Sequence, residues 1–401
     1  MINTHKNSSP LWQTASVLRI ELREIATDSG VALIMLFAIF IYSTLYGAVY
    51  GSEVLREVPI IVVDQSQTPS SRKVSSLIGD GAATRIAYEA QDIEEARRLL
   101  FERKGYAILY IPADYESRLL QGEQALVAIY CDASYFLIYR VAFEQIVAVL
   151  SAVGGEVAFE RFTAAGVDPT QAAAMVEPLR YESHTLFNPS LGYGIFVMPA
   201  VMLIIIQQTL LMGIGIIGGT WRERNLYDEL LPNGERPSLR ALTIGKVTAY
   251  SLVGATTTTL ALSVPYYLLG LPMQGSATTI AALLAPYLLA CTMLGIALST
   301  LFHHRESAIL WLLWSSIPIL MLSGVSYPTG AMPKVLVAIS WLLPSNHAVE
   351  AFIRVRDMGA TTADIAPAIG RLWLLTAIYG TVAVLLLAYE IKDRPKRVER
   401  S

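Results

Sequence analysis

Six long apolar segments constrain what this chain can fold into more than any other feature of its sequence. They are residues 31–50, 193–219, 243–269, 278–302, 308–326 and 372–389. An α-helix rises about 1.5 Å per residue, so about 20 apolar residues cross a hydrocarbon core of roughly 30 Å. Only 16% of the 401 residues are charged, against about 25% in a typical soluble domain. The sequence therefore predicts an α-helical membrane protein with six transmembrane helices.

A further apolar stretch, residues 335–343, is too short to cross a bilayer. Pro333 and Pro344 bound it, and a second short helical run continues to Arg356. Lipid tolerates an interrupted segment only where its free backbone groups are buried in protein or reached by water. We therefore expect a re-entrant or surface-lying helical hairpin before the last span.

The distribution of Lys and Arg predicts the orientation of the chain, because positive charges concentrate in the cytoplasmic loops of membrane proteins. Here they gather on one side of the predicted spans, as Arg222, Arg224, Arg236, Arg240, Arg305, Lys392, Arg394, Lys396, Arg397 and Arg400. Both termini are therefore expected in the cytoplasm of a bacterial cell, with the chain in the inner membrane. Residues 51–191 are expected in the periplasm.

The periplasmic segment is expected to fold as an α/β domain. Its runs rich in Val, Ile and Tyr predict buried strands, and two longer runs that alternate with them predict helices. The strands are residues 58–63, 106–111 and 126–131, and the helices are residues 93–103 and 134–165. The second helix is long enough to form a stalk standing on the membrane. A disordered loop is the alternative, which the β-branched strands disfavour.

The N-terminal region before the first span contains an amphipathic helix. Its apolar residues recur at alternating steps of four and three and so share one face: Leu11, Ala15, Leu18, Leu22 and Ile25. Such a helix either lies in the membrane interface or packs on its neighbours. The predicted organisation is this helix at 1–30, a span at 31–50, the periplasmic domain at 51–191, five spans within 192–390 and a basic tail at 391–401.

The sequence lacks the motifs of a self-contained enzyme. There is no phosphate loop of the form G-x-x-x-x-G-K followed by Ser or Thr, and Gly245-Lys246 opens a predicted span. Cys131 and Cys291 have no Cys or His at metal-ligand spacing. A net charge of -3 excludes a chain-wide nucleic-acid surface. We therefore expect no catalytic residue, no metal ion and no cofactor bound by this chain.

Three local motifs surround the spans. The first is Phe187-Asn188-Pro189, followed by Phe196 and Pro199 at the start of the second span. The second follows that span as a charged run, then a leucine pair and a proline: Arg222, Glu223, Arg224, Asp228, Glu229, Leu230, Leu231 and Pro232. The third precedes the last span and consists of Ser323, Gly324, Pro328, Met332, Pro333, Leu343 and Pro344. Its prolines break helix at defined points.

With these motifs, the layout resembles the permease subunits of the type 2 ABC exporter family, in the branch with a large periplasmic domain between the first two transmembrane helices. The resemblance covers nearly the whole chain. It implies a permease dimer, either homodimer or heterodimer, above ABC ATPase subunits that bind ATP and Mg. It also implies that the charged run and leucine pair dock on the ATPase as the coupling element. The hairpin around the third motif then dips into the outer leaflet above the translocation route.

Two glutamines in the second predicted span are candidates for the translocation path. Uncharged amides in a membrane helix seek polar partners or a wet cavity. Gln207 and Gln208 therefore either line the path or form hydrogen bonds between helices. Ionisable residues deep in the spans are sparse, which disfavours the carboxylate relay of a proton-coupled carrier.

The function that follows from the resemblance is efflux. We expect the membrane subunit of an ATP-driven exporter of a drug, lipid or other amphiphile, powered by a separate ATPase and surrounded by membrane lipid. Family members of this shape often work beside a periplasmic adaptor and an outer-membrane exit duct. The alternative is a membrane-anchored sensor or assembly factor, whose periplasmic domain binds a ligand and which needs no ATPase partner.

Overall fold

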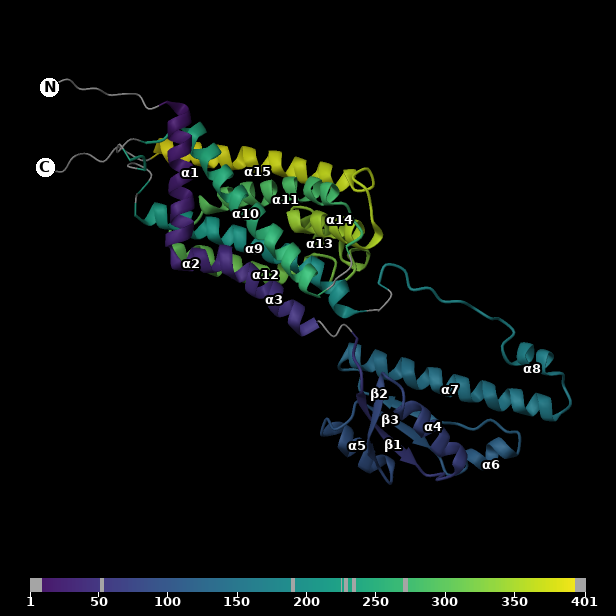
Figure 1. Cartoon of the computed structure of the whole chain (residues 1–401). Coiled ribbons are helices and arrows are strands. Elements are labelled where there is room, and N and C mark those ends of the chain that lie inside the picture. The colour runs from purple at the N-terminus through teal and green to yellow at the C-terminus, as the bar shows by residue number, and fades with distance from the viewer. Residues whose placement is uncertain are drawn as a thin grey trace, which may run out of the picture. The chain divides into compact units, whose positions relative to one another are not determined.

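The computed structural model describes residues 9–50, 54–188, 192–224, 226, 230–232, 236–269 and 273–393. The chain divides into two compact units. One unit combines Met1–Glu53 with Thr185–Ser401, and the other is Val54–His184. The described part of the first unit is helical, and the second unit contains a small sheet with helices (Figure 1).

The first unit is a bundle of long helices. Its elements are α1 (Pro10–Thr27), α2 (Ser29–Ala32), the π-helical turn η1 (Leu33–Ala38), α3 (Ile39–Tyr50), α9 (Tyr193–Glu223), α10 (Leu239–Leu269), α11 (Ala277–Ser299), α12 (Arg305–Leu322), the 3-10 turn η3 (Thr329–Ala331), α13 (Lys334–Ser340), α14 (Pro344–Met358) and α15 (Ala366–Asp393). Ser9, Asp28 and Ser276 accept backbone N–H groups at the starts of α1, α2 and α11. These caps satisfy donors that a helix start leaves free.

Helix α9 is the centre of this bundle. Its most apolar stretch is 89% buried, and it packs against α3, α11, α12 and α14. A helix that is apolar on every face belongs in such an interior. Glycine permits the closest approach to α12, since a Cβ added at Gly219 would lie 2.9 Å from the backbone of His304.

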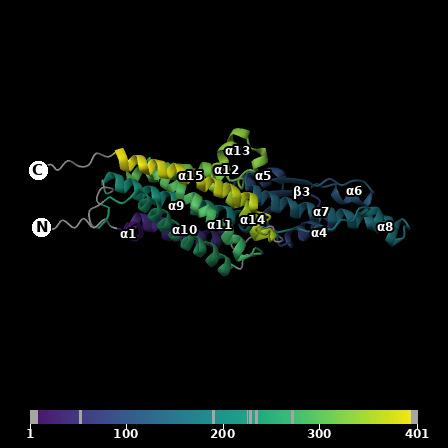
Figure 2. The same cartoon turned by 90° about the horizontal axis from the view of Figure 1, so that it is seen from above.

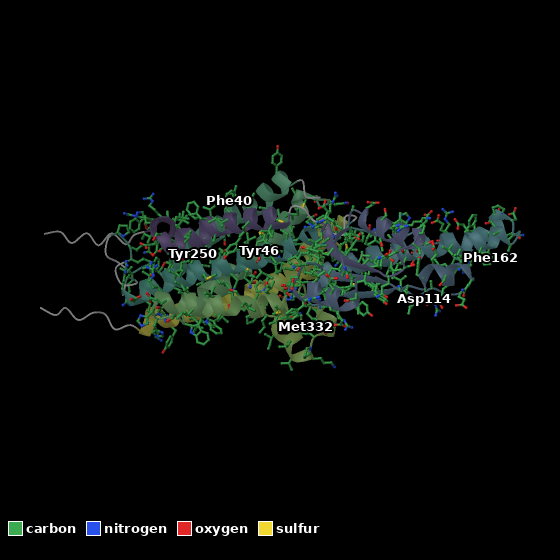
Figure 3. All side chains as sticks on the ribbon, turned by 90° about the horizontal axis from the view of Figure 1, so that it is seen from below. Phe40, Tyr46, Asp114, Phe162, Tyr250 and Met332 are labelled. Atoms are coloured by element: carbon green, nitrogen blue, oxygen red, sulfur yellow. The ribbon has the colours of Figure 1, made fainter. Side chains whose placement is uncertain are left out.

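The outer helices of the bundle expose apolar side chains. In α12, Trp311 and Trp314 are 72% and 79% exposed, and only 17% of the helix's apolar stretch is buried. Phe40 of α3 lies at the edge of the unit, whereas Tyr250 of α10 lies inside it (Figure 3). Exposed apolar faces of this extent are stable in lipid and not in water. The prediction of a helical membrane protein is therefore confirmed.

By length and composition, six helices among the described residues could cross a membrane. They are Ser29–Val49, Phe136–Ala164, Tyr193–Glu223, Ala277–Ser299, Arg305–Leu322 and Ala366–Lys392. Phe136–Ala164 is helix α7 of the second unit, and the other five coincide with predicted spans. The predicted span 243–269 lies in α10, which is not among the six, although it packs within the bundle against α1, α3 and α11.

The second unit is built on a four-stranded mixed sheet. Its strands are β1 (Val58–Asp64), β2 (Thr84–Glu89), β3 (Ala107–Ile111) and β4 (Ala128–Cys131), in the order β2-β1-β3-β4. Strand β1 pairs in parallel with β2 and β3, and β4 is antiparallel to β3. The helices are α4 (Pro69–Gly79), α5 (Ile93–Phe101), α6 (Tyr115–Leu120), α7 (Phe136–Ala164) and α8 (Pro169–Val176).

Helices cover both faces of this sheet. Ile60 and Val62 of β1 pack in a core with α4 and α7, whereas Ile61 and Val63 pack in a second core with α5. A strand buried on both faces has a nearly continuous apolar sequence, which makes β1 recognisable. The edge strand β2 was missed because polar residues, among them the exposed Arg85 and Glu89, interrupt its apolar pattern.

Helix α7 is apolar enough to cross a membrane but packs on this sheet. Ile146 is fully buried in the core that α7 shares with β1. Glu156 pairs with Lys73 of α4 at 2.7 Å, and Arg161 donates to the carbonyl oxygen of Leu119 at 2.6 Å. These contacts make α7 an element of the α/β unit, in agreement with the predicted helix 134–165.

Candidate functional site

The predicted coupling loop begins where α9 ends. Arg222 is turned into the bundle, with its Nε 2.9 Å from Oε1 of Glu390 in α15, and the two side chains are 14% and 7% exposed. Glu223 and Arg224 are exposed. Asp228 and Glu229, which were also predicted to contact the ATPase, lie outside the described residues.

The leucine pair of this loop lies in the core of the chain itself. Leu230 is 9% exposed and Leu231 is 2% exposed, within the apolar cluster that includes Trp221 and Leu242. The resemblance implies that the pair docks on the ATPase. In the structure, both side chains are covered by their own bundle. The pair therefore fastens the loop to the helices.

Ionic and polar contacts join several helices at this end of the first unit. Arg305 at the start of α12 pairs with Asp28, the N-cap of α2, at 3.1 Å. Arg236 donates to the carbonyl oxygen of Ile391 in α15 at 3.2 Å. Figures 1 and 2 show α1 and the C-terminal end of α15 at the same end of the unit. These contacts link α2 to α12, and the segment before α10 to α15, at one end of the bundle.

Helix α1 packs on α10. Its buried residues are Val17, Glu21 and Ile25, which are four residues apart and so share one face. Leu11, the first residue of the predicted apolar face, is 83% exposed. The packed face is thus offset from the predicted one and has a carboxylate at its centre, as in a helix packed on its neighbours.

The carboxylate of Glu21 belongs to a buried polar group that sequence analysis missed. Lys246 Nζ lies 2.5 Å from Glu21 Oε1, and Tyr250 Oη lies 2.5 Å from Glu21 Oε2. Lys246 Nζ is also 3.8 Å from the centre of the Trp221 ring. A lysine inside a predicted span implies a buried partner, so a signal was present. It did not identify Glu21, which is 225 residues away.

Gln207 and Gln208 form hydrogen bonds from α9 to other helices. Gln207 Oε1 accepts from the N–H of Ser345 in α14 at 2.9 Å. Gln208 Nε2 donates to the carbonyl oxygen of Leu312 at 2.9 Å and to Ser316 Oγ at 2.8 Å, both in α12. Both glutamines are buried, and Gln207 Nε2 and Gln208 Oε1 have no hydrogen-bond partner within the described parts of the chain.

We expect Gln207→Leu to lower the free energy of unfolding by about 1–3 kcal/mol, because the buried N–H of Ser345 loses its acceptor. The control Gln208→Leu should cost less, since the hydroxyl of Ser316 also donates to Leu312 and keeps that partner. Thermal unfolding of both variants in one detergent measures the difference. A lower midpoint for Gln208→Leu than for Gln207→Leu would contradict this role of Gln207.

Helices α13 and α14 form a bent helix pair in the segment where a re-entrant or surface-lying hairpin is predicted. The two helices are bent by 86° from one another. Pro333 is the N-cap of α13, and Pro344 opens α14. Ser323 is the C-cap of α12. Gly324 follows it with φ of +83°, a conformation that glycine adopts without strain, and Pro328 precedes η3.

Helix α14 runs antiparallel to α9 inside the bundle. Ser345 near its start contacts Gln207, and Arg356 near its end donates to the carbonyl oxygen of Ile195 at 2.6 Å. Helix α13 is different, because Val335 is 71% exposed and the helix stands out from the others of this unit (Figure 2). One arm of the pair is therefore part of the core and the other is not.

The α/β unit offers a polar cleft. A cavity of about 850 Å³ lies beside α4 at the carboxyl ends of β1 and β2, with Asp64, Gln67 and Glu89 in its lining. Burial raises the pKa of Cys131 to about 11, so its thiol is a poor nucleophile at neutral pH. Across the described ranges, no cluster of three or more His, Cys, Asp or Glu could hold a metal ion.

Comparison with known proteins identifies the family. The family described as "ABC-2 family transporter protein" matches residues 29–385. The "Probable multidrug ABC transporter permease YbhR" of Escherichia coli (strain K12) is 19% identical over 381 residues, which cover 95% of this chain and 99% of the relative. The "Inner membrane transport permease YhhJ" of the same strain is 25% identical over 373 residues, 91% of this chain and 94% of the relative. This chain therefore belongs to the ABC-2 family of transporter permeases.

Proposed function

We propose that this chain is the membrane-spanning subunit of an ATP-driven exporter whose ATPase is a separate polypeptide. The family match over residues 29–385 carries the proposal, because an ABC-2 permease works with an ABC ATPase. The sequence has no phosphate loop of the Walker type, so ATP and Mg bind to the partner.

The end of the bundle that carries the 222–231 loop is the surface we assign to this partner. Glu223 and Arg224 are exposed there, while the Arg222–Glu390 pair and the buried Leu231 tie the loop to the helices. Closure of the ATPase would therefore move the spans through a loop that is already fixed to them. The active assembly contains two permeases, either two copies of this chain or this chain with a related one.

The translocation path lies, in this proposal, beside Gln207 and Gln208. Each keeps one buried polar atom without a partner among the residues that the structure describes, and such an atom can bind a polar part of a substrate. The α13–α14 pair is assigned as a re-entrant hairpin above this path, since the two helices bend sharply and α13 exposes apolar residues.

The proposed substrate is an amphiphile such as a drug or a lipid. Two of the relatives, YbhR and YbhS of Escherichia coli, are named probable multidrug ABC transporter permeases. YbhS is 26% identical over 165 residues, 41% of this chain. The exposed apolar faces of the bundle suit a substrate that enters from lipid. Export to the cell exterior would use a periplasmic adaptor and an outer-membrane exit duct.

The proposed orientation puts both termini in the cytoplasm and the α/β unit in the periplasm of a bacterial inner membrane. It rests on the clustering of Lys and Arg on one side of the spans. Alkaline phosphatase is active only outside the cytoplasm. We expect activity from a fusion near Gly122 and none from a fusion near Arg397. The reverse pattern would refute the orientation.

Affinity purification of the full chain from native membranes tests the function. We expect an ABC ATPase to co-purify, and the complex to hydrolyse ATP faster than the ATPase alone. A chain that purifies without any ATPase would instead support the sensor or assembly factor, for which the cleft of the α/β unit would be the ligand site.

A further inference from the structure

The buried group formed by Glu21, Lys246, Tyr250 and Trp221 joins three helices. Glu21 comes from α1, Lys246 and Tyr250 come from the early part of α10, and Trp221 lies near the end of α9. Each of these side chains is at most 2% exposed. The two carboxylate oxygens of Glu21 have separate donors, the Lys246 ammonium and the Tyr250 hydroxyl. Because both oxygens are held, α1 is fixed against α10 in rotation as well as in position.

The backbones of α1 and α10 meet beside this group. A Cβ added at Gly245 would lie 2.7 Å from Cβ of Val17 and 3.2 Å from the backbone nitrogen of Leu18. Nearer the N-terminal ends of both helices, the N–H of Ser238, the residue before α10, donates to Gln13 Oε1 of α1 at 3.0 Å. The contact between α1 and α10 is therefore close, and a polar bond holds it near each end.

Stability alone does not explain an ion pair at this position. Taking two charges out of water costs several kcal/mol per ion, and well-packed apolar side chains often replace a buried pair without loss of stability. A carboxylate between two directed donors does restrict the arrangement of the helices more than an apolar contact would. The group is therefore suited to hold one helix in a fixed position on another.

The group also lies next to the loop that faces the proposed partner. Trp221 directly precedes Arg222, the first charged residue of that loop. Its ring contacts the Lys246 ammonium, and that ammonium pairs with Glu21. A displacement of the loop thus reaches α10 through Lys246 and α1 through Glu21.

We infer that Glu21 is a positioning residue, which holds α1, the start of α10 and the loop end of α9 together as one body during the transport cycle. The inference rests on the proposed function, because it assigns the route by which movement of the ATPase reaches α1. Helix α1 then transmits the movement of the ATPase as a packed part of the bundle, and it does not lie free in the membrane interface.

Two variants and one control of the full chain, each in complex with its ATPase in lipid nanodiscs, test the inference. The variant Glu21→Gln keeps the shape of the side chain and removes its charge. The double variant Glu21→Leu/Lys246→Met replaces the pair by apolar groups. The control Glu24→Gln makes the same chemical change three residues along α1, where the carboxyl is partly exposed.

The readouts are permease-dependent ATP hydrolysis, thermal stability and the distance between spin labels on α1 and α10. Labels at the exposed Arg19→Cys and Arg240→Cys, in a Cys131→Ser background, report that distance with and without trapped ATP and vanadate. For the wild type and Glu24→Gln we expect one narrow distance that trapping leaves unchanged. For the double variant we expect nearly wild-type stability, a broadened distance and about tenfold less permease-dependent hydrolysis, within the usual range of coupling energies.

A double variant with a narrow distance and wild-type hydrolysis would overturn the inference, since the group would then only pack the bundle. A wild-type distance that changes on trapping would also overturn it. If the double variant does not fold, Glu21→Gln decides: a loss of hydrolysis supports the inference, and unchanged hydrolysis overturns it. A wild-type chain that binds no ATPase refutes the proposed function itself, whereas a wild-type complex with insensitive variants refutes the inference alone.

Discussion

The change Lys246→Met, with Glu21 kept, is expected to lower the free energy of unfolding by about 3–5 kcal/mol, because it leaves a buried charge without its counter-ion. Glu21 is 0% exposed, so water cannot replace the ammonium at 2.5 Å. The Tyr250 hydroxyl remains as a single donor to one oxygen. Thermal unfolding of the purified chain in detergent measures the loss.

Lys334→Met is the matched control for this prediction. Lys334 is exposed at the start of α13, so the same chemical change should shift stability by no more than about 0.5 kcal/mol. Adding Glu21→Leu to Lys246→Met should restore most of the lost stability, because no unpaired charge then remains. Equal losses for Lys246→Met and Lys334→Met would show that Glu21 and Lys246 do not form a buried pair.

The membrane part of the fold was predictable because lipid imposes a simple rule on the sequence. A span needs a long apolar run, and five predicted spans coincide with helices that satisfy this requirement. The same rule does not show whether an apolar helix is surrounded by lipid or packs on protein. Phe136–Ala164 satisfies it too, yet this segment is α7, whose Ile146 packs on a sheet.

Local signals predicted only part of the α/β unit. The strands β1 and β3 are apolar along most of their length, so their burial was evident in the sequence. Helix α4 was missed although Thr68 and Ser71 form a capping box and Pro69 follows the cap. That signal is short and polar, and it was hidden in a segment with few apolar residues.

The candidate site was least predictable where its contacts are distant in sequence. The charged run that begins at Arg222 was assigned to the contact with the ATPase, but Arg222 itself pairs with Glu390, 168 residues away. Gln207 was recognised as unusual in a span, while its bond to Ser345 depends on how α14 packs. Such contacts are set by tertiary packing, on which the local pattern has no bearing.

The double change Leu230→Ala/Leu231→Ala is expected to uncouple the chain from its ATPase. Truncating a buried leucine costs about 2–5 kcal/mol, and both side chains lie in the core of the bundle. The loop would then detach from the helices, so that movement of the ATPase would no longer be transmitted to α9. The exposed Glu223 should matter less, because a surface charge contributes about 0–1 kcal/mol.

The measurements are co-purification of the ATPase and its permease-dependent hydrolysis, for Leu230→Ala/Leu231→Ala, for Glu223→Ala and for a matched leucine control. The control is Leu252→Ala/Leu260→Ala, since these leucines of α10 are 54% and 51% exposed and their truncation opens no cavity in the core. We expect hydrolysis to fall most in the first variant and to stay near wild type in the control. If Leu230→Ala/Leu231→Ala keeps the partner and its full hydrolysis, the 222–231 loop does not couple the two subunits. Movement of the ATPase then could not reach Trp221 and Glu21 through this loop.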